Sequence, residues 1–251
     1  MEVALEQRAT KRRLGEETLL VLALSLLPST ISAIISLTER PIAGETVALF
    51  PQTDLLFTVA LRRFVDLLFD FAPVWLAIYL IRRGGENASV IGMQTSEIPR
   101  GIALGVPIGL GLALLGGLGQ AVTVAMGIQR FLIPIPELGH WWSIPMVVLG
   151  YLATSFLEEV VVAAYLVHRL LQMGWKPYLA ILASAVFRAS YHLYQGFGGF
   201  IGNLLMGLLF AWLFVKFRKT WVLIVAHFVL DGSATLAYLA VRGHCVLGTC
   251  F

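Results

Sequence analysis

Long apolar runs separated by short polar segments dominate the pattern along the chain. A helix needs about 20 mostly apolar residues to cross a bilayer. Seven apolar runs meet this length, and a further segment at 44–63 contains Arg62 and Arg63, which favour an interfacial position over a span. We therefore predict an all-α, polytopic membrane helix bundle of seven, or with this segment eight, transmembrane helices. The seven expected spans are 17–37, 64–82, 101–126, 144–167, 176–195, 199–216 and 220–241.

The composition agrees with a membrane protein. Of the 251 residues, 58% are hydrophobic and only 13% are charged, whereas typical soluble domains have about 25% charged residues. The chain has no polar or Pro-rich linker, which favours a single membrane domain over residues 1–251. A net charge of +3 without a long basic block argues against nucleic acid as a partner.

Lys and Arg residues flank the apolar runs unevenly. If seven helices alternate across the bilayer, four groups of these residues fall on one side. Cytoplasmic loops are enriched in Lys and Arg, so we expect the N-terminus in the cytoplasm and the C-terminus outside. The sequence leaves open whether Cys245 and Cys250 form a disulfide in that outer, oxidising space. The four groups are Lys11, Arg12 and Arg13; Arg82 and Arg83; Arg169 and Lys176; and Lys216, Arg218 and Lys219.

Ionisable residues inside the apolar runs are concentrated in the second half of the chain. Residues four apart lie on one helix face, so each helix presents its pair in one direction. Buried carboxylates need partners, and we expect the helices to bring these groups together. For Asn203 we favour a supporting role as polar glue between helices, and for His140 and His168 a solvated or interfacial position. The clustered residues are Glu158 and Glu159, Arg188 and His192, and His227 and Asp231.

Two chemistries fit this set. Glu and His can activate a water while a second His stabilises the oxyanion of a tetrahedral intermediate. Alternatively, Glu158, His192, His227 and Asp231 can bind a divalent metal such as zinc, which lowers the pKa of its bound water. The HExxH helix of soluble zinc proteases is absent. The same groups can also relay protons in a small transporter.

At these residues, over about 145–240, the chain resembles the CAAX-processing and bacteriocin-processing intramembrane endopeptidases, the CPBP or ABI family. The family pattern is EExxxR, FxxxH and HxxxN (or HxxxD/S) in chain order. Here "EEVVVA" supplies both glutamates, "RASYH" supplies His192, and "HFVLD" supplies His227. Three positions differ from the commonest pattern: Ala163 replaces the Arg, Arg188 replaces the Phe, and Asp231 replaces the Asn.

The resemblance implies an intramembrane endopeptidase that uses a Glu/His-activated water to hydrolyse a peptide bond of a membrane-associated protein or peptide. By position, Glu158 and His192 would activate the water, and His227 and Asp231 would stabilise the oxyanion or complete the site. Glu159 joins them as a candidate catalytic residue. We expect Arg188 to pair with Glu159 and to supply, from the next helix, the charge that Ala163 lacks.

Several alternatives stay open at this point. The family has been interpreted both as metalloenzymes and as metal-free glutamic peptidases, and the resemblance does not decide between them. The chain could be a catalytically lapsed relative that acts as a binding or bacteriocin-immunity protein, or a small proton-coupled transporter. In each case we expect an integral protein of a bacterial plasma membrane, with the lipid bilayer as its surroundings.

Overall fold

The computed structural model describes residues 2–39, 41–48, 57–134, 142–241, 245–246 and 249–250, and these are mainly helical. Two short sheets accompany the helices. Strand β1 (Thr46–Ala48) pairs in parallel with β2 (Phe131–Ile133), and β3 (Cys245–Val246) pairs antiparallel with β4 (Thr249–Cys250). The α-helices are α1 (Glu2–Leu24), α2 (Leu27–Glu39), α3 (Phe57–Asp70), α4 (Ala72–Arg83), α5 (Ile98–Ala125), α6 (Ser143–Phe156), α7 (Val167–Gln172), α8 (Pro177–Ser190), α9 (Phe197–Phe217) and α10 (Thr220–Val241). Shorter or wider helices are η1 (Ala88–Ile91), η2 (Thr95–Glu97), η3 (Leu157–Leu166) and η4 (Leu193–Gln195).

The all-α fold class is confirmed, whereas the expected count of seven spans is not. Within the described residues, five helices are long and apolar enough to cross a membrane, or six if the bent α1–α2 pair is one span. The predicted span at 176–195 is shorter than expected, because α8 has only 14 residues. It is about 21 Å long, whereas the bilayer core is about 30 Å thick. The segment at 44–63 is not one membrane helix, since it contains β1 and α3 begins only at Phe57.

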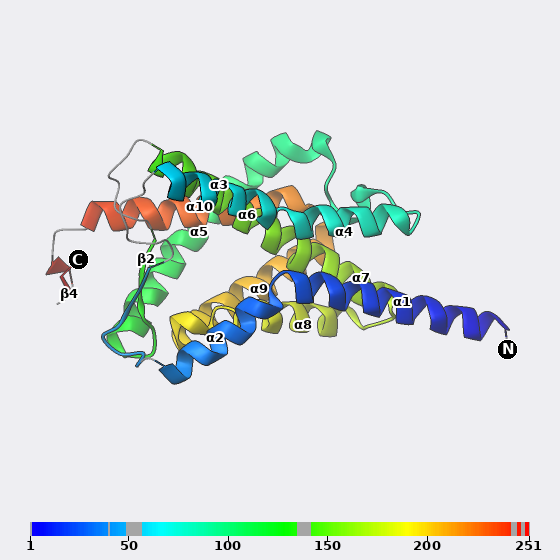
Figure 1. The fold of residues 1–251 in the computed structure, drawn as a ribbon, viewed down its shortest axis with the longest axis horizontal. Coiled ribbons are helices and arrows are strands. Elements are labelled where there is room, and N and C mark those ends of the chain that lie inside the picture. The colour runs from blue at the N-terminus through cyan, green and yellow to red at the C-terminus, as the bar shows by residue number, and fades with distance from the viewer. Residues whose placement is uncertain are drawn as a thin grey trace.

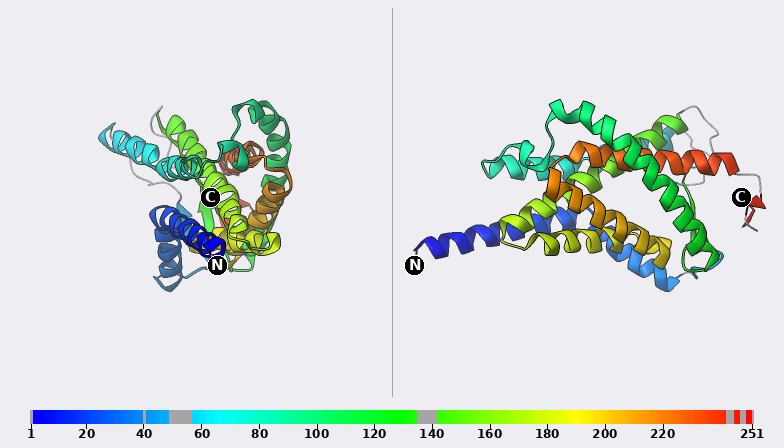
Figure 2. Two further views of the ribbon diagram at one scale, coloured as in Figure 1. Left: turned by 90° about the vertical axis from the view of Figure 1, so that its right-hand side faces the viewer. Right: turned by 180° about the vertical axis from the view of Figure 1, so that it is seen from behind.

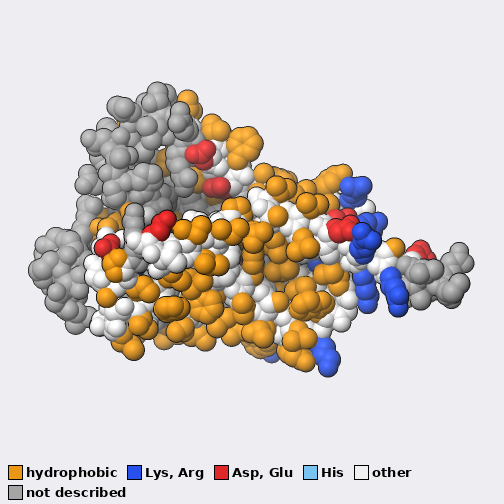
Figure 3. All heavy atoms as spheres, turned by 60° about the horizontal axis from the view of Figure 1, so that its bottom comes forward, with side chains coloured by type: hydrophobic (Ala, Val, Ile, Leu, Met, Phe, Trp, Pro, Cys, Tyr) orange, Lys and Arg blue, Asp and Glu red, His pale blue; other side chains and the backbone are white. Residues whose placement is uncertain are grey.

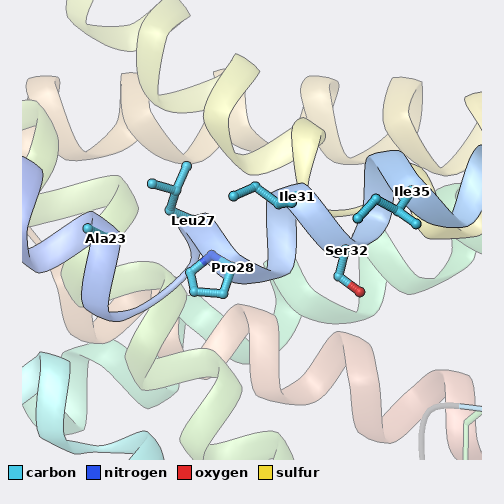
Figure 4. A pocket seen from close by; sticks show the side chains of 6 residues that line it. All are labelled: Ala23, Leu27, Pro28, Ile31, Ser32 and Ile35. Atoms are coloured by element: carbon cyan, nitrogen blue, oxygen red, sulfur yellow. The ribbon is translucent and has the colours of Figure 1, made fainter.

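The run at 17–37 forms two helices that meet at an angle of 53°. Pro28 explains the break, because its ring lacks an N–H and would clash with the carbonyl of Leu24, the last residue of α1. The two helices border an apolar groove (Figure 4). The groove is lined by Ala23, Leu27, Pro28, Ile31, Ser32 and Ile35.

Most helices run along the long axis of the molecule, with the two chain ends at opposite ends of it (Figures 1 and 2). Lys and Arg side chains gather at the end where the N-terminus lies, and hydrophobic side chains cover the middle (Figure 3). The uneven distribution of Lys and Arg is therefore present in three dimensions. Which end faces the cytoplasm stays a prediction.

A network of polar residues ties several elements together at this basic end. Glu86, just after α4, accepts hydrogen bonds from His168 (3.1 Å) and Gln172 (2.8 Å), and Arg169 lies 3.5 Å away. Arg218, in the turn between α9 and α10, donates to the other ring nitrogen of His168 at 3.1 Å. His168 thus lies near the end of its span as expected, but it is buried and bonded to protein groups.

Helices α5 and α10 pack closely because α5 carries a stripe of glycines. Gly101, Gly105 and Gly109 all face α10. A Cβ atom at Gly105 would lie 2.7 Å from the Cβ of Val225 and 2.8 Å from the carbonyl oxygen of Val222. Small residues let membrane helices approach to this distance, which strengthens their van der Waals packing.

The most buried span is the continuous helix Ser143–Gln172, formed by α6, η3 and α7. Of its most apolar stretch, 61% is buried, more than in any other candidate span of the described chain. Its middle section, η3, is a π-helix. The hydroxyl of Ser184 on α8 donates to the Val162 carbonyl of this section at 2.9 Å. Stretches of π-helix such as η3 are rare and are frequently found at functional sites.

Candidate active site

Five ionisable side chains form a buried row in which negative and positive groups alternate. The row begins on η3, passes through α8 and ends on α10. Arg188 places Nη2 2.8 Å from Glu158 Oε2 and Nη1 2.8 Å from Glu159 Oε1. His227 Nδ1 lies 2.8 Å from the same oxygen of Glu159, and His227 Nε2 lies 3.5 Å from Asp231 Oδ2. The order is therefore Glu158, Arg188, Glu159, His227, Asp231.

The middle of this row is completely enclosed, whereas its ends are less so. The side chains of Glu159 and Arg188 are 0% and 2% exposed, and that of Asp231 is 23% exposed. Buried carboxylates are tolerated when opposite charges and hydrogen bonds compensate them. The alternation provides this compensation, and it explains how two adjacent glutamates occupy an apolar helix.

Arg188 makes the contact expected from the sequence, and a second one with Glu158. The sequence predicted a pair with Glu159, and the guanidinium bridges both glutamates with one nitrogen each. Helix α9 holds it from the other side, where Met206 Sδ lies 3.7 Å from Nη2 and the Phe210 ring lies 5.6 Å from the guanidinium carbon. These two residues could not be predicted from the sequence, because nothing in an apolar run marks which members face a cation.

The surroundings of His227 favour its doubly protonated form. Each of its ring nitrogens faces a carboxylate oxygen, and an ionised carboxylate only accepts hydrogen bonds. Arg188 Nη2 also lies 3.4 Å from Nδ1, and a hydrogen bond between these two nitrogens would require Nδ1 to be unprotonated. The 2.8 Å contact with Glu159 is shorter and links opposite charges, so we assign the proton to Nδ1.

His192 lies beside the first member of the row. Its Nδ1 is 3.0 Å from the Arg188 carbonyl oxygen, an acceptor, so Nδ1 carries the proton. Nε2 then presents a lone pair toward Glu158 Oε1, 4.0 Å away. This distance is too long for a direct hydrogen bond, but one water about 2.8 Å from each atom can donate one hydrogen bond to Glu158 Oε1 and one to His192 Nε2. The pair is thus arranged to bind and polarise a water.

The early end of α8 places His192 in this position. The helix stops at Ser190, and the chain then turns through η4 to Gly196, whose φ is +97°. Glycine adopts this left-handed conformation at no steric cost. A Cβ atom at Gly196 would also lie 2.8 Å from the Ile128 carbonyl oxygen. A full-length helix to residue 195 would have carried His192 along a different path.

Two further residues from the sequence analysis lie apart from the row or outside the described chain. The amide of Asn203 donates to the Gly199 carbonyl of its own helix at 3.0 Å. Its suggested supporting role is therefore limited, in the contacts described, to its own backbone. His140 lies outside the described residues.

A metal would compete with Arg188 for the same oxygens. Glu158, Glu159 and His227 each offer a ligand atom, and these atoms lie within 4.8 Å of one another. This set differs from the expected ligands, since Glu159 takes the place of His192 and Asp231. By type and spacing it could hold zinc, with ligand distances of about 2.0–2.2 Å. The Arg188 guanidinium already contacts both carboxylates, so a metal would have to displace it.

Fold and site together define a class: a polytopic helical membrane protein with a buried acid–histidine cluster. The family model of the type II CAAX prenyl endopeptidase Rce1-like proteins matches residues 140–233. This match includes the whole row from Glu158 to Asp231 and confirms the resemblance to the CPBP family. It also implies a protease. No curated protein and no solved structure matches the chain.

Proposed function

We propose that this protein is an intramembrane endopeptidase that hydrolyses a peptide bond with a water held between Glu158 and His192. The observation that carries the proposal is the 4.0 Å separation of Glu158 Oε1 and His192 Nε2, both hydrogen-bond acceptors. A water that donates to both atoms directs a lone pair of its oxygen away from them, toward a substrate carbonyl. Its nucleophilicity rises because both protons are already held.

In the reaction, the water oxygen forms a bond to the carbonyl carbon, and one water proton passes to Glu158. The carbonyl oxygen becomes an oxyanion, which the positive charge of His227 stabilises electrostatically. When the intermediate collapses, the C–N bond breaks and Glu158 returns the proton to the leaving amine. Glu158 is thus ready for the next turnover, and the products are a carboxylic acid and an amine, which then equilibrate with water to carboxylate and ammonium.

Arg188 has a supporting role in this scheme. It compensates Glu159 as well as Glu158, so that Glu158 stays ionised while its second oxygen faces the water. A zinc ion, if bound, would be held by Glu158, Glu159 and His227 and would supply an acidified water. The steps above use only the side chains of the chain.

The position of the site supports a membrane-associated protein or peptide as substrate. Glu158 lies roughly halfway along the 30-residue span Ser143–Gln172. The scissile bond must therefore reach the interior of the bundle, which favours a membrane segment or an inserted tail over a soluble loop. We further propose that the end rich in Lys and Arg faces the cytoplasm.

Comparison of membrane-protein fragments in cells that produce wild type or Glu158→Gln tests the proposal. Fragments that accumulate with wild type and are absent with the variant would identify the substrates. The variant must be produced at an equal level and unfold at a similar temperature. Identical fragments from both would favour a relative that binds or protects a partner without cleaving it.

A further inference from the structure

The turn that carries His192 is held from outside its own helix as well as by α8. Residues 191–196 connect α8 to α9, and they lie against the segment just before β2. The backbone N–H of Arg130 donates to the Gln195 carbonyl at 2.8 Å, and the N–H of Gly198 donates to the Ile128 carbonyl at 2.9 Å. The position of His192 therefore depends on a segment more than 60 residues away along the chain.

The side chain of Arg130 adds a second set of contacts from the same place. It is 1% exposed, and burying a guanidinium is costly unless its donors are used. Nη1 donates to the Tyr194 carbonyl at 2.5 Å and to the Ser36 hydroxyl at 2.7 Å. Nη2 donates to the Ser36 carbonyl at 2.9 Å, and Nε donates to the Pro41 carbonyl at 3.2 Å. The guanidinium thus joins the His192 turn to the last turn of α2 at Ser36 and to Pro41 beyond that helix.

We propose that Arg130 is a positioning residue that holds the 191–196 turn and thereby sets the place and tautomer of His192 relative to Glu158. Tyr194, whose carbonyl it binds, is two residues from His192, and α2 packs against this turn. The inference rests on the proposed function for the effect on cleavage, but its effect on His192 is independent of catalysis. Arg130 lies 28 residues before Glu158, outside the three motifs.

Arg169 offers a matched control. It is also 1% exposed, and it donates to the Leu80 carbonyl at 3.0 Å and to Gln172 at 2.8 Å. Those contacts lie in the polar network at the basic end of the molecule, away from the His192 turn. Loss of either arginine removes a buried cation and several hydrogen bonds. Only the loss of Arg130 should change the environment of His192.

The experiment measures the tautomer of His192 by nitrogen NMR on protein labelled with ¹⁵N-histidine in nanodiscs, with His192→Gln to assign its signal. Wild type should show a proton on Nδ1 alone. Arg130→Gln should give mixed tautomers or a broadened signal, and should lower kcat about 10- to 100-fold with little change in KM. Arg130→Lys should recover part of both effects, and Arg169→Gln should leave the His192 signal as in wild type.

Unchanged His192 signals in Arg130→Gln and Arg130→Lys would overturn the proposal. So would an equal change in Arg169→Gln, because the effect would then be one of general stability. If neither Arg130 variant folds, Ser36→Ala decides, since it removes one acceptor and should produce a smaller shift of the same kind. An unchanged signal there counts against positioning. Full cleavage by Glu158→Gln would instead refute the proposed function. The His192 NMR signal would still test whether Arg130 positions His192.

Discussion

Replacing Arg188 with methionine tests the charge compensation in the row, because Arg188 lies between the two glutamates. Methionine keeps much of the length and volume of the side chain but removes its charge. Two adjacent carboxylates, which are 5% and 0% exposed, would then lose the cation that lies 2.8 Å from each of them. The row would change from three negative and two positive groups to three negative and one positive.

The expected loss of stability is large. Removing one partner of a buried ion pair costs about 3–5 kcal/mol, because the other charge remains buried without compensation. For a domain of this size that corresponds to a drop in the unfolding temperature of about 6–20 °C. The double variant Glu158→Gln with Arg188→Met removes both members of the outer pair and leaves Glu159 with His227. It should regain at least half of the loss, which a double-mutant cycle would report as coupling.

Thermal unfolding in detergent, followed by tryptophan fluorescence, measures both variants. Arg12→Met is the matched control, because Arg12 lies 2.8 Å from Glu16 in an exposed pair. It should unfold at the wild-type temperature, since solvent screens such a pair. An Arg188→Met variant that unfolds within about 2–4 °C of wild type, or a double variant without recovery, would refute the compensating role of Arg188.

A rescue variant tests the same reasoning from the family pattern. Ala163→Arg combined with Arg188→Phe restores the residues of EExxxR and FxxxH. Ala163 is 3% exposed in the core, so an arginine there needs the volume that Arg188 vacates. The double variant should be more stable and more active than Arg188→Phe alone. Equal behaviour of the two would mean that an arginine at position 163 cannot reach the glutamates.

Other predictions concern the bundle, its orientation and metals. Gly105→Ala should lower stability by about 1–3 kcal/mol through overpacking against α10, whereas Gly111→Ala, with nothing within 4 Å of the added Cβ, should not; equal unfolding temperatures would contradict the close packing. Reporter fusions after Gly84 and Arg218 should report cytoplasm and a fusion after Phe251 the outside; the reverse would overturn the assigned orientation. Because a guanidinium already holds both carboxylates, dialysis against EDTA should leave cleavage unchanged, and loss of activity that zinc restores would contradict this.

Much of the fold could be predicted from apolar runs, because length and hydropathy alone determine whether a helix can span a bilayer. The bend between α1 and α2 was also encoded locally, in Pro28, but a hydropathy pattern does not register it. The short α8 was not predictable from hydropathy, since its end depends on the turn at Gly196 packing against Ile128. The β1–β2 pair joins residues 85 positions apart, and three-residue strands carry too weak a pattern to reveal it.

The charged members of the row could be predicted because ionisable residues in apolar helices require one another. Their spacing also predicted that Arg188 would reach a glutamate on the preceding span. The π-helix could not be predicted, since "LEEVVVAAYL" reads as an ordinary apolar helix. Arg130 was also missed, because its acceptors are mainly backbone carbonyls, which every residue type provides.

Activation of the water by Glu158 is tested by the cleavage rate of a membrane peptide substrate by purified protein in liposomes, compared between wild type and Glu158→Gln. Loss of a general base costs about 10²–10⁴-fold in rate, and Gln keeps the shape of the side chain. If Glu158 is the general base, the rate should fall at least about 100-fold with the fold retained. A variant that cleaves within about tenfold of wild type would show that Glu158 does not activate the water.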